Sequence, residues 1–192
     1  MKLIIQRGLV FAVTVCCLFV LTVRGVHAEG KKSVHASAVI YACDDPSATR
    51  GFAILRELRS DEGIKEVEVT MKVFGMLEGK HAVHIHEAAE CEPCGAAGGH
   101  FDPGPFGFSS PDGNHPYHSG DLINIEVKND GKGMLKTVTN RVTLSSGPLS
   151  LFDEDGSAFI IHVDPDIYCP EGEESGCAGG ARAACGIIGL DD

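Results

Sequence analysis

The sequence predicts an all-β domain, an antiparallel sandwich or barrel of about eight strands with two long functional loops. Three observations indicate this fold: short runs with strand periodicity, turn residues between them at hairpin spacing, and little sign of helix. The clearest run is Lys65–Phe74. Its apolar residues recur at every second position, at Val67, Val69, Met71 and Val73. This alternation is typical of a strand with one buried face.

The expected strands are, in chain order, Ser33–Ala42, Gly51–Leu58, Lys65–Phe74, Ile123–Val127, Met134–Val138, Val142–Leu144, Ala158–His162 and Ala184–Ile188. Turn residues separate several of them, such as Asn129-Asp130-Gly131 and Asp155-Gly156. Two segments, Ala88–Asp121 and Val163–Arg182, are long, rich in Gly and Pro, and without strand periodicity. Loops of this length are usually functional or disordered. Because histidines and cysteines are concentrated in them, we expect functional loops held by metal and disulfides.

The first 28 residues have the layout of a secretory signal peptide. Lys2 and Arg7 precede the apolar run Leu9–Val23, and Val26-His27-Ala28 resembles a small-residue cleavage site. The run is too short and too poorly flanked for a membrane span, and an uncleaved anchor is the alternative. The sequence therefore predicts a signal peptide over residues 1–28, one domain over residues 29–192, and a periplasmic or secreted location.

The chain is acidic, with a formal net charge of −11. The expected leader carries Lys2, Arg7 and Arg24 but no acid, so its removal makes the rest more acidic still. A charge of this sign argues against nucleic acid and anionic membranes as partners, and we expect neither. A site that used an anionic substrate would need a positive charge of its own.

Histidines gather in Lys80–Phe101, which reads KHAVHIHEAAECEPCGAAGGHF. His84 and His86 are two residues apart in a strand-like run, so their side chains leave the same face. Val83 and Ile85 would then point into the core. His81 has the opposite parity, and we expect it to support the ligands from behind.

Further candidate ligands follow along the chain: His100, His118, Asp121 and His162. Histidine 100 comes after two glycines, whose lack of side chains lets the backbone approach a site closely. Four imidazoles suit copper, and imidazoles combined with a carboxylate suit zinc. A calcium or magnesium site would need mostly oxygen ligands.

This set of motifs strongly resembles the copper/zinc superoxide dismutase family over essentially the whole chain after the leader. The residues that carry the resemblance are HAVHIHE (His81–Glu87), GGHFDP (Gly98–Pro103), HSGDL (His118–Leu122), DGSAFIIHVDPD (Asp155–Asp166) and GARAACGIIG (Gly180–Gly189). The resemblance implies a Greek-key β-sandwich, which agrees with the strands expected above. It also implies superoxide as the substrate, and a homodimer, because the family forms dimers.

The resemblance assigns roles by motif. It implies that copper is bound by His84, His86, His100 and His162, with His100 bridging to a zinc ion that is also bound by His118 and Asp121. It implies that Asp166 orients metal-bound imidazoles and that Arg182 attracts the anionic substrate. His100 and Arg182 would be the catalytic residues, His100 by taking up and returning a proton.

Two departures from the family pattern leave alternatives open. The family has a further zinc-binding histidine about eight residues after the bridging one. Here the region reads GPFGFSSPDGNH, with Phe108 near the expected place, and His115 is either the substitute ligand or a solvated loop histidine. The family disulfide implies a partner for Cys185, for which we favour Cys94, with Cys91 as the alternative. Cys169 and Cys177, eight residues apart in one loop, could pair with each other and leave Cys43 for the remaining cysteine, with free thiols in place of one pair as the alternative.

The sequence therefore predicts an exported copper-dependent superoxide dismutase with zinc as a second cofactor. A non-catalytic copper-binding or buffering protein is the alternative from a different class. A β-sandwich domain with a decaying zinc loop, which would bind no copper, is the third interpretation. The retention of Arg182 favours the enzyme, because a storage protein needs no anion-guiding arginine.

Overall fold

The structure is a computed structural model that describes residues 33–59, 62–104, 118–168 and 176–191. Residues 32–192 form one compact unit. The expected signal peptide lies outside the described residues, as do Phe108, His115 and Cys169. Within the described part of the chain, no helix has the length and apolar character needed to cross a membrane.

The described residues form ten strands and one short 3-10 helix. These are β1 (His35–Ala42), β2 (Thr49–Arg59), β3 (Lys65–Val73), β4 (Gly79–His81), β5 (Val83–His86), η1 (Cys94–Ala97), β6 (Ile125–Val127), β7 (Gly133–Thr139), β8 (Ala158–His162), β9 (Arg182–Ile187) and β10 (Gly189–Leu190).

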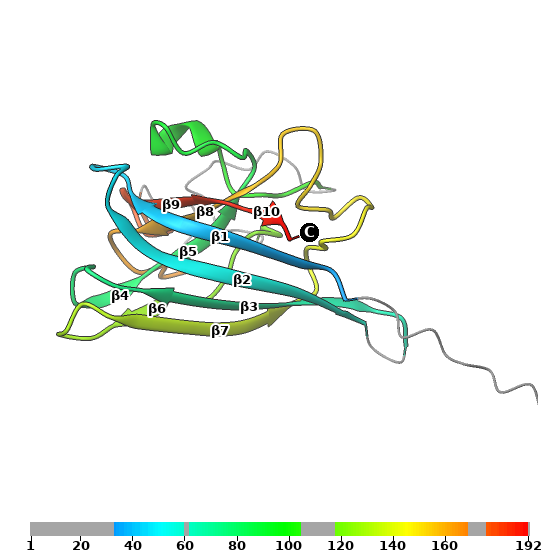
Figure 1. The fold of residues 1–192 in the computed structure, drawn as a ribbon, viewed down its shortest axis with the longest axis horizontal. Coiled ribbons are helices and arrows are strands. Elements are labelled where there is room, and N and C mark those ends of the chain that lie inside the picture. Colours follow the sequence, from blue (N-terminus) through cyan, green and yellow to red (C-terminus); the bar gives the residue numbers. More distant parts are fainter. Residues whose placement is uncertain (1–32, 60–61, 105–117, 169–175, 192) are drawn as a thin grey trace, which may run out of the picture. The chain divides into compact units, whose positions relative to one another are not determined.

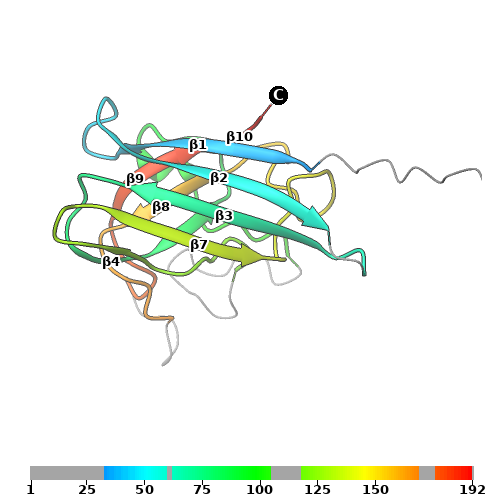
Figure 2. The ribbon, with the colours of Figure 1, turned by 60° about the horizontal axis from the view of Figure 1, so that its bottom comes forward.

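All strand pairs are antiparallel and belong to one sheet, in the order β4-β6-β7-β3-β2-β1-β9-β8-β5, with β10 beside β1. The two ends of this order, β4 and β5, are separated in the chain only by Ala82. The sheet therefore curls into a nearly closed barrel. Figure 1 shows β1, β2, β3 and β7 side by side. In Figure 2, the segment after β8 leaves the barrel on the side away from β1 and β2. The expected all-β antiparallel fold is confirmed.

The barrel encloses one main core. In β3 the alternating residues Val67, Val69, Met71 and Val73 are all buried, as their period predicts. The same period in β1 and β2 turns small or branched side chains inward. Burying apolar side chains from every side of the barrel supplies the main stabilisation of this scaffold.

The prediction of a strand at Val142–Leu144 is wrong. Val142 and Leu144 are buried, but their backbone belongs to a loop with only an isolated bridge between Thr143 and Ser150. The backbone N–H of Leu144 donates to the Glu57 carboxylate at 2.7 Å instead of to a neighbouring strand. An apolar run can be buried without being a strand when a side chain satisfies its backbone.

Candidate metal centre

Strand β5 is the base of the candidate site, and all four of its residues are buried. Val83 and Ile85 point into the main core, which places His84 and His86 together on the opposite face. One edge of β5 pairs with β8, bringing His84 opposite Ile160. The sequence alternation of β5 thus aims two imidazoles away from the core.

The other edge of β5 is bonded by loop backbone. The N–H of Ile85 donates to Gly120 O at 2.9 Å, and the N–H of Phe101 donates to Ile85 O at 2.8 Å. Isolated bridges follow, joining His86 to His100 and His84 to Asp121. Residue 120 must be glycine for this approach, because an added Cβ would lie 2.2 Å from Ile85 O. Two separate parts of the first long loop, around His100 and around Asp121, therefore meet at β5.

Four histidines converge here, which we term the four-histidine group: His84, His86, His100 and His162. One ring nitrogen from each lies within 4.8 Å of the others, and all four residues are buried. The ring centroids of His84 and His100 are 4.0 Å apart, and those of His84 and His162 are 4.9 Å apart. The structure thus brings together all four histidines that the sequence analysis assigned to copper.

The outward nitrogen of each of three rings is held by an acceptor. His84 Nε2 donates to Asp166 Oδ2 at 2.9 Å, His86 Nδ1 to Gly98 O at 3.0 Å, and His162 Nδ1 to Gly180 O at 2.9 Å. Because carbonyl and carboxylate oxygens only accept, these nitrogens must carry the protons. Each ring is therefore fixed with its lone pair on the other nitrogen.

Those remaining nitrogens are the strongest sign of a metal. His84 Nδ1, His86 Nε2 and His162 Nε2 are buried and have no hydrogen-bond partner among the described residues. Buried polar atoms are almost always paired, and three lone pairs aimed into one space fit a bound cation. The imidazole donor set fits a copper ion.

The protonation states agree with this fit. Burial lowers the pKa of His86 well below its ordinary value of 6.5, and the charges of His100 and Arg182 lower it further. Burial and the neighbouring histidines lower the pKa of His162 to about 3. Both rings are therefore neutral at neutral pH, which is the form that binds metal.

A second set of ligands, the mixed group, consists of His100, His118 and Asp121, with ligand atoms within 4.8 Å of one another. His100 Nδ1 donates to Asp121 Oδ1 at 2.7 Å, and the backbone N–H of His118 donates to Asp121 Oδ2 at 2.8 Å. Burial alone would raise the pKa of the Asp121 carboxyl, but these two histidines hold it well below its ordinary value. Two imidazoles and a carboxylate suit zinc. His100 belongs to both groups.

Several residues support the ligands from behind. His81 has one ring nitrogen 2.9 Å from His162 O and the other 2.9 Å from Leu77 O, so it lies beneath the candidate ligand His162. Asn124 brackets Asp166, because its side chain bonds both the N–H and the C=O of that residue. Arg141 Nη2 donates to the backbone oxygen of Asp121. Sequence reasoning missed Asn124 and Arg141, since neither lies in a recognisable motif.

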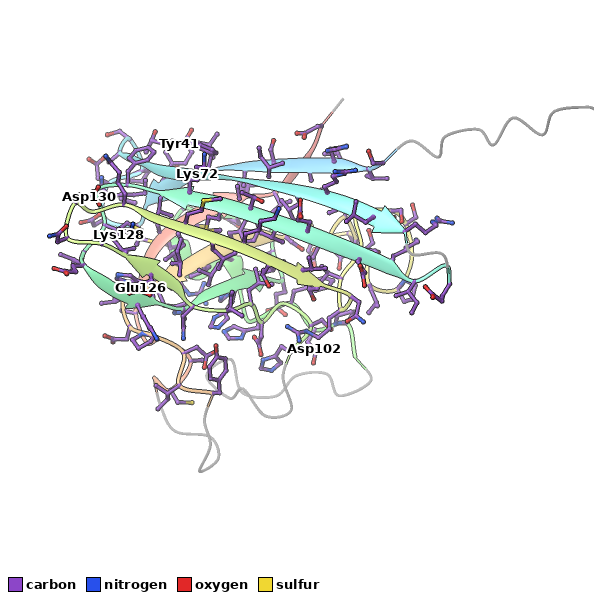
Figure 3. The ribbon with its side chains drawn as sticks, turned by 90° about the horizontal axis from the view of Figure 1, so that it is seen from below. Tyr41, Lys72, Asp102, Glu126, Lys128 and Asp130 are labelled. Carbon is purple, nitrogen blue, oxygen red and sulfur yellow. A yellow bond between two sulfur atoms is a disulfide. The ribbon has the colours of Figure 1, made fainter. Side chains whose placement is uncertain are left out.

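Arg182 lies at the start of β9 and is half-buried. Its Nη1 donates to Cys94 O at 2.6 Å, and its Nη2 donates to Gly98 O. Gly98 O also accepts from His86 Nδ1, so the guanidinium lies close to the four-histidine group, and its charge helps to lower the pKa of both His86 and His162. Figure 3 shows that Asp102, two residues after His100, lies on the side of the barrel away from Tyr41.

The expected disulfide between Cys94 and Cys185 is wrong, and the alternative is correct: Cys91 bonds Cys185, with Cα atoms 5.7 Å apart. Cys94 instead bonds Cys43, with Cα atoms 5.6 Å apart. The pairing of β1 with β9 brings Cys43 and Cys185 close together, so the segment after β5 can reach both.

A further expected disulfide joins Cys169 to Cys177. Cys177 is part of a disulfide, but Cys169 lies outside the described residues, so this pairing stays a prediction.

The fold and site define a class of protein: an antiparallel β-barrel with two adjoining metal-binding groups that share one imidazole. The family described as copper/zinc superoxide dismutase matches residues 49–188. The chain therefore belongs to the copper/zinc superoxide dismutase family.

Individual relatives agree with this membership. The Cu-Zn superoxide dismutase of Deinococcus radiodurans is 39% identical over 134 residues, which cover 62% of this chain and 69% of the relative. The crystal structure of a SOD-like protein from Bacillus subtilis has a TM-score of 0.60 and 28% identity, covering 79% of this chain and 96% of the other. A double mutant of a SOD-like protein from the same organism has a TM-score of 0.59 and 32% identity, covering 79% and 95%.

Proposed function

We propose that the protein is an exported superoxide dismutase, which converts superoxide into dioxygen and hydrogen peroxide. Copper would be held by the four-histidine group and zinc by the mixed group. The observation that carries the proposal is the convergence of buried imidazole lone pairs beside an arginine that two backbone carbonyls hold in place.

Copper held by imidazoles exchanges one electron at a time: one superoxide loses an electron and becomes dioxygen, and another gains an electron and two protons and becomes hydrogen peroxide. The side chains of this chain would bind the substrate, deliver protons and keep the ligands in place.

Arg182 would bind the substrate. The chain is acidic overall and repels anions, so a local positive charge is needed at the site. The guanidinium is held by Cys94 O and Gly98 O beside the four-histidine group, and a guanidinium binds anions through charge-assisted hydrogen bonds.

His100 would carry a proton. Its Nδ1 faces the Asp121 carboxylate, which leaves Nε2 for the four-histidine group. A ring nitrogen in this position can take up a proton and return it to the reduced product. The shared position of His100 between the two groups supports this role.

Export would suit the cysteines. Cys43, Cys91, Cys94, Cys177 and Cys185 are all bonded in disulfides. Disulfides persist in oxidising compartments such as the periplasm or the extracellular space. We therefore propose that residues 1–28 are a signal peptide and that residues 29–192 form the exported domain.

The proposal is tested with protein purified from the periplasm or culture medium of an expression host. Copper and zinc content is measured by elemental mass spectrometry, and superoxide decay is followed by pulse radiolysis on the same sample. Copper-dependent decay supports the dismutase. Bound copper without turnover would favour the copper-buffering alternative, and a chain that takes up no copper would overturn both. His35→Ala, which removes a histidine outside the site, is the control and should behave like the wild type.

A further inference from the structure

Two disulfides meet in the short segment that follows β5. Cys91 is bonded to Cys185 in β9, and Cys94, only three residues later, is bonded to Cys43 just after β1. The segment is therefore tied to two different strands of the barrel. Cys94 is buried beside Ala158 and Ile160, whereas Cys43 is half-buried.

The same segment supplies the carbonyl groups that hold the arginine. Arg182 donates from Nη1 to Cys94 O and from Nη2 to Gly98 O. Gly98 O also accepts from His86 Nδ1, so one carbonyl oxygen orients both a candidate copper ligand and the guanidinium. A displacement of this segment would move the arginine relative to the four-histidine group.

Cys43 connects this segment back to the arginine's own strand. The N–H of Cys43 donates to Ala183 O at 2.9 Å, next to Arg182 in β9. A closed ring results, which runs from the Arg182 guanidinium through Cys94 O and the disulfide to Cys43 and back to β9. The backbone beside Arg182 and its guanidinium are therefore both connected to Cys43, the backbone through the hydrogen bond to Ala183 O and the guanidinium through Cys94 O and the disulfide.

The other disulfide does not replace this connection. It fixes Cys91, while the carbonyl that binds Arg182 belongs to Cys94 at the start of η1. This helix is a single turn with no side-chain cap at its N-terminus, so it has little stability of its own. The bond to Cys43 is the covalent anchor at the residue that contacts the arginine.

We infer that the Cys43–Cys94 disulfide positions Arg182 for the anionic substrate. The inference rests on the proposed function, since it gives Arg182 the task of binding superoxide. The disulfide itself touches no reacting atom. It acts through the Cys94 carbonyl, and its loss would leave the metal ligands in place but loosen the guanidinium.

The test compares wild type with Cys43→Ala/Cys94→Ala, which leaves no unpaired thiol. In both proteins, loaded with zinc and with copper kept as diamagnetic Cu(I), and without substrate, NMR of the arginine side chains reports whether the Nη protons of one guanidinium rotate slowly. The Arg182→Lys variant assigns the signal. We expect slow rotation in the wild type and its loss in the alanine pair. Slow rotation in both proteins would overturn the inference, whatever the activity.

Kinetics give the second measurement. Misplacing a binding group by about 1 Å can cost up to about 100-fold, so for a loosened arginine we expect kcat/KM to fall roughly five- to tenfold at full metal content. In an Arg182→Ala background the same cysteine substitutions should cause no further loss. Independent losses that multiply would mean that the disulfide only supports the fold, and would overturn the inference.

Two controls keep the result decisive. Asp45→Ala disturbs the exposed β1–β2 turn, where Asp45 accepts from Ser47, but leaves the disulfide intact, and it should keep the wild-type arginine signal. If the alanine pair does not fold, Cys43→Ser/Cys94→Ser is examined by the same NMR measurement with the same two outcomes. Because this measurement needs no turnover, a wild type that lacks dismutase activity would refute the proposed function without deciding the positioning.

Discussion

The four-histidine group and the mixed group share His100 but are held in different ways. In the first, an acceptor outside the group fixes the outward nitrogen of His84, His86 and His162, and their other nitrogens converge without a partner among the described residues. In the second, the candidate ligands bond each other, with His100 Nδ1 only 2.7 Å from Asp121 Oδ1.

The difference teaches what a metal must do in each place. A cation in the four-histidine group would satisfy lone pairs that the protein has already oriented, so binding it requires little rearrangement of the side chains. A cation in the mixed group would have to replace the hydrogen bond between His100 and Asp121. The described residues supply three ligands there, whereas structural zinc normally takes four. We therefore expect copper to be bound more tightly than zinc, relative to each metal's usual protein sites.

Removing one ligand from each group should have the largest effect. His86→Ala removes a ligand and should lower copper affinity by more than about 100-fold. A residue that only orients a ligand would change the affinity by roughly 10- to 100-fold. Activity should be lost with the copper. His118→Ala should lower zinc affinity and leave copper bound. Competition titrations with chelators measure both. An active His86 variant with normal copper content would mean that the ligands are misassigned.

Arg182 lies beside the four-histidine group, so its removal should separate substrate attraction from metal binding. Arg182→Ala should lower kcat/KM by roughly tenfold or more and flatten its dependence on salt, since local fields raise association rates by about 10- to 1000-fold. Copper and zinc contents should not change. Arg56→Ala, which removes an exposed arginine from β2, is the matched control. Equal kinetics for both variants would remove the proposed role of Arg182.

Acid should affect His162 and Asp121 over different pH ranges in the metal-free protein. His162 has a folded pKa of about 3 against an ordinary value of 6.5, so between these values the unfolded chain binds more protons. The free energy of unfolding should therefore fall as the pH drops from 6.5 towards 3. The lowered pKa of Asp121 adds a loss only below its ordinary value of 3.8. Urea unfolding at pH 7, 5.5 and 4 measures the first range, and His162→Gln should reduce the slope. A slope unchanged by this substitution would contradict the assignment.

Arg141 offers the smallest test, on the mixed group alone. Its guanidinium bonds the backbone oxygen of Asp121, so Arg141→Ala should lower zinc affinity by about three- to tenfold, the value of roughly one hydrogen bond, without altering copper affinity. Arg141→Lys should restore part of the loss. Lys136→Ala removes an exposed cation from the neighbouring strand β7 and is the control. A change in copper affinity as large as that in zinc affinity would contradict the separation of the two groups.

The sequence predicted the barrel well because alternation is a local property. The runs at β1, β2, β3, β7 and β8 all contain a face of apolar residues at period two or a short buried run, and the structure has strands in each place. Val142–Leu144 failed because its backbone partner is the Glu57 carboxylate, 87 residues away in the chain from Leu144. No local pattern can indicate such a contact.

The candidate site shows the same limit. His84 and His86 could be placed on one face from parity alone, but the carbonyl acceptors at Gly98 and Gly180 have no signal in the sequence, because every residue has a carbonyl group. The disulfide was misassigned for a related reason. Cys91 and Cys94 are three residues apart, and only the approach of β1 to β9 decides which of them meets Cys185.

The seam of the barrel has a consequence for how the protein behaves when it is short of metal. The sheet order starts at β4 and ends at β5, and beyond β5 the described backbone that bonds this edge lies around Phe101 and around Gly120 and Leu122, at the two ends of one long loop. Were this loop to come away, the row of N–H and C=O groups along Val83–His86 would be open to a strand from another molecule. A shortage of metal would then promote self-association. The bound ions would therefore protect the edge of β5 from pairing with another molecule, in addition to their part in the reaction.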